Sequence, residues 1–113
     1  MFGAIAPMPA EYIADEAAFD ELVKSDSVVV VDCTASWCGP CKLVAPLMDQ
    51  LSEEFDGKAT ISKLDLDSNK PVAQRFGIKS IPAVMVFKNG ELMDTMVGVK
   101  PYSTFKETVE SYL

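Results

Sequence analysis

The sequence predicts a single α/β domain with a mixed β-sheet, because helix-like and strand-like segments alternate and then end in a hairpin. The order is helix, strand, helix, strand, helix, hairpin, helix, over 113 residues. That length allows one real core and is too short for two domains. Alternating strands and helices form parallel crossovers, whereas Asn89-Gly90 between two strand-like runs favours a tight antiparallel turn. We therefore expect parallel strands first and an antiparallel hairpin last.

The first two elements follow from hydrophobic spacing. Residues 15–24 have the pattern of a short amphipathic helix, and the continuous β-branched run over 28–33 indicates a central strand buried on both faces. A two-residue period places Asp32 on the same face of that strand as Val28 and Val30, with Cys33 on the opposite face. Asp32 is thus expected among apolar neighbours.

The longest predicted helix covers residues 38–55. Apolar residues recur in it every four positions, flanked by Val44 and Met48, and are expected to pack along one side: Leu43, Leu47, Leu51 and Phe55. Pro46 interrupts this helix and Gly57 follows its end.

The rest of the chain is predicted as strands and helices in turn: a strand over 58–65, a helix over 68–76, strands over 83–87 and 92–97, and a helix over 101–113. Residues 1–10 are apolar, carry no positive charge and are too short to span a bilayer. We expect a flexible tail there, followed by a single domain over 11–113.

Composition excludes several functions. Ten basic and 17 acidic residues give a net charge of −7 without a basic cluster, which argues against nucleic-acid and membrane partners. The absence of histidine excludes Ser–His and Cys–His catalysis and nearly every zinc hydrolase. Three cysteines, an odd number, do not fit a disulfide-stapled secreted framework. We expect a monomeric cytoplasmic protein, although a processed organellar protein would have the same composition.

The stretch Trp37-Cys38-Gly39-Pro40-Cys41-Lys42 lies between the valine-rich strand and the long helix. Cys38 is expected in the first helical turn, where free N–H groups and the helix dipole favour a thiolate. Cys41 follows three residues later on the same helix face, so the two sulfurs can close a small ring. Gly39 allows another backbone to approach closely, and Pro40 fits a first turn. The pattern predicts a dithiol/disulfide exchange site.

Metal binding is the main alternative for these cysteines. With Cys33 they form the spacing Cys-x4-Cys-x2-Cys, which imitates a plant-type ferredoxin. A fourth cysteine is missing and no histidine can replace it, so only a cluster shared between two chains would satisfy the ligand rules. We therefore expect no metal and no cofactor, and we interpret Cys33 as a small buried hydrophobic residue.

Asp32 is the candidate proton acceptor of the exchange site. Cys41 must lose a proton before it can attack, and the chain has no histidine to take it. The hypothesis is that Asp32 accepts this proton, directly or through a water molecule, with a pKa raised by its apolar surroundings.

The chain resembles the thioredoxin family over residues 11–113. The resemblance rests on Trp-Cys-Gly-Pro-Cys-Lys after a Val-Asp strand, on Ile81-Pro82 before a strand, and on Lys-Asn-Gly at the hairpin. It implies the thioredoxin fold, a central mixed sheet of four to five strands flanked by about four helices. It also implies a protein-disulfide reductase, acting as an electron carrier, in which Cys38 attacks and Cys41 resolves. Its expected partners are disulfide-containing target proteins and an external thioredoxin reductase, either an NADPH-fed flavoprotein or a ferredoxin-linked enzyme.

The resemblance assigns further roles residue by residue. Asp32 matches the family's buried acid, Lys63 the lysine beside it, and Pro82 the cis-proline that faces the disulfide. The implied substrate-contact surface consists of six residues: Trp37, Gly77, Ile81, Pro82, Val97 and Gly98. The family often has an aromatic pair after the buried acid, with tryptophan second, whereas this chain has Cys33 and Thr34.

Two other functions are compatible with the residues. One is a non-catalytic binding subunit with the same fold, in which the dithiol is incidental. The other is an iron–sulfur carrier bridged by two chains. Within the enzyme class, a disulfide oxidase or isomerase is a further alternative, and the Gly39-Pro40 pair resembles reducing members of the family.

Overall fold

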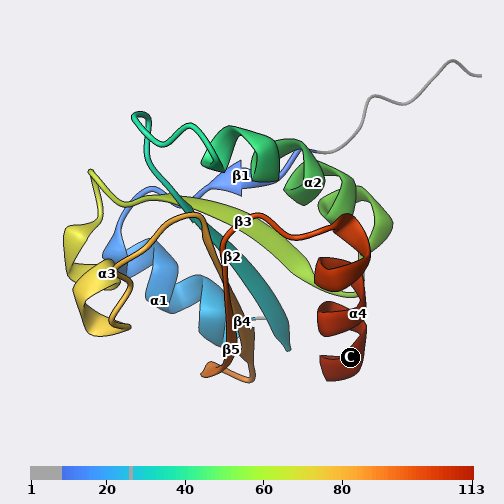
Figure 1. Ribbon diagram of the computed structural model, residues 1–113. Coiled ribbons are helices and arrows are strands. Elements are labelled where there is room, and N and C mark those ends of the chain that lie inside the picture. Colours follow the sequence, from blue (N-terminus) through green and yellow to red (C-terminus); the bar gives the residue numbers. More distant parts are fainter. Residues whose placement is uncertain (1–8, 26) are drawn as a thin grey trace, which may run out of the picture.

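The valine run forms the central strand of a five-stranded sheet in this computed structural model, which describes residues 9–25 and 27–113 (Figure 1). The strand order is β1-β3-β2-β4-β5. The strands are β1 (Glu11–Tyr12), β2 (Val28–Thr34), β3 (Thr60–Asp65), β4 (Ala83–Lys88) and β5 (Glu91–Val97). β1 and β2 run parallel to β3, while β4 is antiparallel to both β2 and β5. The predicted mixed sheet, with its antiparallel hairpin last, is confirmed.

Two pairs of helices cover the two faces of the sheet (Figure 1). The helices are α1 (Glu16–Ser25), α2 (Cys41–Glu54), α3 (Lys70–Arg75) and α4 (Tyr102–Tyr112). α2 and α4 pack against Val28 and Val30 of β2, whereas α1 and α3 pack against Val29, Val31 and Cys33. The predicted alternation along β2 is therefore confirmed, and it turns Asp32 toward α2.

The buried side of α2 agrees with the predicted one except at Leu43. Leu43 is 63% exposed, whereas the side chains that face the core are spaced by three or four residues: Cys41, Val44, Met48, Leu51 and Phe55. A strict four-residue repeat drifts around a helix of about 3.6 residues per turn, so only its C-terminal members reach the core. The predicted inward position of Leu43 was wrong for this reason.

The start of the domain contains a strand that hydrophobic spacing did not predict. β1 has only two residues, too few for a periodic signal, and it pairs with Ser62 and Lys63 of β3. Ala10, just before it, is buried and its N–H donates to Asp49 Oδ1 at 3.0 Å. Residues 1–8 of the predicted tail lie outside the described residues.

The hairpin between β4 and β5 turns at Asn89 and Gly90. Their φ angles are 53° and 83°, the left-handed pair that a type I′ turn requires, and asparagine and glycine adopt it at least cost. This turn brings Val97 and Gly98 back beside Pro82, near the start of β4.

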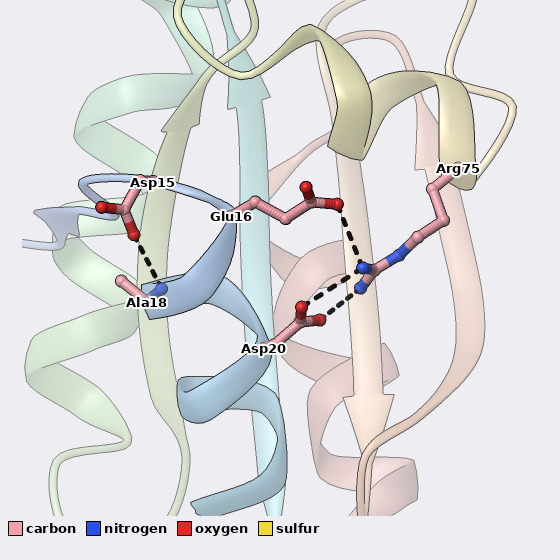
Figure 2. A network of polar contacts seen from close by, with 5 residues as sticks. All are labelled: Asp15, Glu16, Ala18, Asp20 and Arg75. Atoms are coloured by element: carbon pink, nitrogen blue, oxygen red, sulfur yellow. Dashed lines mark hydrogen bonds and ion pairs between the residues drawn. The ribbon is translucent and has the colours of Figure 1, made fainter.

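Arg75 joins α3 to α1 (Figure 2). Its guanidinium donates to Asp20 Oδ1 at 2.6 Å and to Glu16 Oε2 at 3.2 Å, and it lies 5.3 Å from the ring centroid of Phe19. Beneath it, Phe19 contacts the rings of Phe76 and Phe87 at centroid distances of 5.6 and 5.5 Å.

Figure 2 also shows Asp15 accepting the N–H of Ala18 at 2.8 Å, which caps the start of α1.

Replacing Phe19 with alanine is expected to destabilise the domain by about 3–5 kcal/mol, because Phe19 is fully buried and its loss leaves a cavity among aromatic rings. Urea denaturation measures this difference. Leu43→Ala on exposed α2 surface is the control and is expected to change stability by about 0.5 kcal/mol or less. Equal losses in the two variants would contradict the assignment of the core.

Candidate active site

Cys38 and Cys41 form a disulfide where β2 leads into α2. Their Cα atoms are 5.4 Å apart, and both residues are buried, at 4% and 2% exposure. The chain reaches this point through a turn in which the N–H of Cys38 donates to the carbonyl of Ala35 at 3.1 Å. The predicted pairing of the two sulfurs is thus present in the structure.

Cys38 lies just before the helix rather than in its first turn. α2 begins at Cys41, and Pro40 occupies the N-cap. Gly39 and Pro40 form a preceding turn, whose carbonyls accept the N–H groups of Lys42 and Leu43 at 3.0 Å each. Proline has no N–H with which to close an earlier helical turn.

The sulfur of Cys38 nevertheless lies at the N-terminal end of α2. The N–H of Cys41 donates to Cys38 Sγ at 3.3 Å, so the sulfur stands at the positive end of the helix, where a capping group would be. Such a position stabilises a thiolate more than a thiol.

Asp32 is buried beneath the helix, at 1% exposure. Among the described residues, neither of its carboxylate oxygens has a hydrogen-bond partner. Burial raises the pKa of Asp32 to about 7, the nearby Lys63 charge lowers it, and the Asp49 charge raises it. A carboxyl group with such a pKa exchanges protons near neutral pH.

Lys63 lies beside Asp32 in the sheet but pairs with a different acid. The two residues are register partners on β3 and β2, yet Lys63 Nζ is 2.9 Å from Asp49 Oδ1 on α2. The sequence reasoning missed Asp49. No sequence pattern indicated Asp49, because its contact with Lys63 forms only through tertiary packing.

The loop before β4 brings three of the predicted contact residues together. The Ile81–Pro82 peptide is cis, and Ile81 packs against the buried cluster of Ala35 and the two cysteines. The N–H of Gly98 donates to the carbonyl of Pro82 at 2.8 Å, and Gly98 has a φ of 95°, which favours glycine. Pro82 itself is buried, Ile81 and Gly98 are partly buried, and Val97 is exposed.

Trp37 and Gly77 complete the predicted surface in different ways. Trp37 is 70% exposed, and its indole N–H donates to Asp67 Oδ1 at 3.1 Å, a partner that the sequence did not indicate. Gly77 ends α3, where its N–H donates to the carbonyl of Gln74 at 3.2 Å. The described contacts of Gly77 are thus with α3 and do not reach the disulfide.

Cys33 does not join the other two cysteines. It is fully buried in the core under α1 and α3, on the opposite face of β2 from Asp32. Burial raises the pKa of its thiol to about 12, and the Asp32 charge adds to this. Within residues 9–25 and 27–113, no three His, Cys, Asp or Glu side chains are grouped as metal ligands.

Thr34 lines a small surface pocket of about 190 Å³ beside Cys41. The other lining residues come from four neighbouring segments: Tyr12, Ala35, Ser36, Lys42, Ala45 and Asp65. A tryptophan at position 34, as in many proteins that the sequence resembles, would place an indole at this wall, whereas threonine leaves the space open.

None of the described helices has the length and hydropathy needed to cross a membrane.

Comparison with known proteins agrees with this geometry. The family model for thioredoxin matches residues 11–111. Thioredoxin 1 of Nostoc is 40% identical over 104 residues, which cover 92% of this chain and 97% of the relative. The chloroplastic M-type thioredoxin of Pisum sativum is 43% identical over 102 residues, covering 89% of this chain and 59% of that protein. A solved Plasmodium falciparum thioredoxin superposes with a TM-score of 0.85 at 34% identity, covering 92% of this chain and all of the other.

The fold, the Cys38–Cys41 disulfide at the start of α2 and these similarities have one common explanation: the chain is a thiol–disulfide oxidoreductase and belongs to the thioredoxin family.

Proposed function

We propose that this protein reduces disulfides in target proteins, with Cys38 as the attacking and Cys41 as the resolving cysteine. The observation that carries this order is the hydrogen bond from the Cys41 N–H to Cys38 Sγ at the start of α2, which favours a thiolate at Cys38. The Cys38 thiolate attacks one sulfur of the target, forms a mixed disulfide and releases the other target sulfur as a thiolate. Cys41 then attacks Cys38 Sγ and releases the second target sulfur, so two electrons pass to the target.

Asp32 is proposed as the base that prepares Cys41. It is turned toward α2, of which Cys41 is the first residue, and its pKa near 7 suits proton transfer at neutral pH. Its carboxylate oxygens, which lack partners among the described residues, are free to accept the thiol proton or a water that carries it.

The target is proposed to bind across Trp37, Ile81, Pro82, Val97 and Gly98. Supporting this, Ile81 packs against the buried cluster that contains both cysteines, and the exposed Val97 and Trp37 offer apolar surface to a partner. Gly77 is proposed only as an outer contact, since its own contacts are with α3.

We propose that an external thioredoxin reductase returns the oxidised protein to its dithiol form. We also propose that the chain acts as a monomeric electron carrier in the cytoplasm. The similarity to a pea thioredoxin described as chloroplastic favours the alternative of an organelle stroma. The reductase is proposed to be either fed by NADPH or linked to ferredoxin, and the preferred electron donor distinguishes these two partners.

In a Cys41→Ser variant, the mixed disulfide between Cys38 and a target is expected to accumulate, because no second thiol can resolve it. Mass spectrometry after reaction with a disulfide peptide measures the adduct, and Cys38→Ser is the matched control that should form none. An adduct on Cys41 in that control would reverse the order of attack. Target-directed activity that survives in Cys38→Ser, Cys41→Ser would instead indicate a binding subunit.

An Asp32→Asn variant is expected to resolve the mixed disulfide about 100-fold more slowly at pH 8 and to lose the rise in rate as pH passes through about 7. Stopped-flow measurement of target release from pH 5 to 9 tests this. An unchanged rate and pH profile would exclude Asp32 as the base.

Unfolding of the same variant provides an independent check on the buried carboxyl. A folded-state pKa raised from 3.8 to about 7 means that wild-type stability falls as pH rises through this window, by up to about 4 kcal/mol. The asparagine side chain of the variant cannot ionise, so the stability of the variant should not fall over this range. A parallel pH dependence in both proteins would show that Asp32 does not hold a proton in the folded state.

Insulin reduction, driven in parallel by an NADPH-linked and a ferredoxin-linked thioredoxin reductase, tests reaction and partner together. We expect turnover with at least one of them, and the faster donor identifies the preferred reductase. Turnover with dithiothreitol but with neither enzyme would contradict recycling by a thioredoxin reductase.

A further inference from the structure

The ammonium of Lys63 pairs with Asp49 rather than with the acid beside it. Asp32 and Lys63 are register partners on adjacent strands, which lie about 4.8 Å apart in a sheet, and their side chains leave the same face. A lysine side chain is long enough to reach a neighbour at that distance. Instead, Lys63 Nζ bonds Asp49 Oδ1 at 2.9 Å, and neither oxygen of Asp32 has a partner among the described residues.

The start of the domain holds this ion pair in place. Asp49 Oδ1 also accepts the N–H of Ala10 at 3.0 Å, so one oxygen serves both donors. Lys63 Nζ lies 5.9 Å from the ring centroid of Tyr12, within the range of a cation–π contact. The N–H of Ile13 donates to the carbonyl of Lys63 at 2.8 Å. Side chain and backbone of Lys63 are therefore both fixed by residues 10–13 and α2.

Few charges act on Asp32 from the elements around it. β3 contributes Lys63 and α2 contributes Asp49. On its other side, β4 presents the apolar Val84, and α4 buries Phe105 and Val109 in the same core. Beyond burial, which raises the pKa of Asp32 most, the charges of Lys63 and Asp49 therefore determine the electrostatic environment of Asp32.

We propose that Asp49 is a positioning residue for the resolving step: it holds the Lys63 ammonium through Oδ1 and so prevents Lys63 from pairing with Asp32. Asp32 is thereby kept as a proton acceptor rather than as the permanently ionised half of a buried salt bridge. This inference rests on the proposed role of Asp32 as base.

The test is the titration of the Asp32 carboxyl by carbon NMR in the full chain, with its signal assigned by its loss in Asp32→Asn. In Asp49→Asn, the side chain can still accept the Ala10 N–H but no longer holds the cation. Lys63 is then free to turn to Asp32, and the midpoint of the Asp32 titration should move down by about one pH unit. The pH profile of target release should move in the same direction.

A double-variant cycle separates positioning from simple charge repulsion. In a Lys63→Met background, Asp49→Asn can act only by removing its own charge, so the downward shift should shrink by at least half. An equal shift in both backgrounds would overturn the proposal, as would no shift in Asp49→Asn alone. Asp49→Glu, which restores a carboxylate, should return the midpoint toward the wild-type value.

Glu53→Gln is the matched control, because it removes an exposed carboxylate from the same helix. It should leave the Asp32 midpoint unmoved, and a shift equal to that of Asp49→Asn would overturn the proposal. The NMR titration does not depend on catalysis. If Asp32→Asn released target normally, the role of Asp32 as base would fail, while the titration would still decide whether Asp49 directs Lys63.

Discussion

The main physical constraint in this structure is the carboxyl group of Asp32. It is buried in the central strand, with no hydrogen-bond partner among the described residues. Every other inward residue of β2 is apolar, and Asp32 is enclosed by strands on both sides and a helix above. An isolated charge in such surroundings is unfavourable, so the group holds its proton to a higher pH. In a chain without histidine, burial thus gives one carboxyl group a pKa of about 7, the range in which the proposed thiol chemistry needs a proton acceptor.

The electrostatics of the site are divided between the two ends of α2. Its N-terminus stabilises negative charge on Cys38, and its second half carries the acid that binds the lysine of β3. Both effects require α2 to lie along the sheet at a fixed rotation, which the buried stripe from Val44 to Phe55 provides. Packing of one helix thus fixes both the disulfide at its start and the ion pair beside Asp32.

Local patterns predicted most of the fold, because the strands and helices here carry strong periodic signals and recognisable turn residues such as Asn89-Gly90. The prediction failed where the signal was short or ambiguous. β1 has two residues, and Leu43 matched a four-residue repeat that the helix does not follow. At the site, Cys38, Cys41 and Asp32 could be found from spacing and strand phase. Asp49 and Asp67 could not, because their partners Lys63 and Trp37 lie 14 and 30 residues away in sequence and meet them only through tertiary packing.

The two outer strands of the sheet bear on how this protein behaves at high concentration. An edge strand exposes unpaired N–H and C=O groups that can template pairing with another chain. Here one edge is the two-residue β1, and the other, β5, carries Glu91 and Asp94 and meets β4 across an irregular register at Val86 and Phe87. Short length, negative charge and a local kink all oppose strand addition. The open edges of this sheet are thereby protected against pairing with those of other copies into fibres.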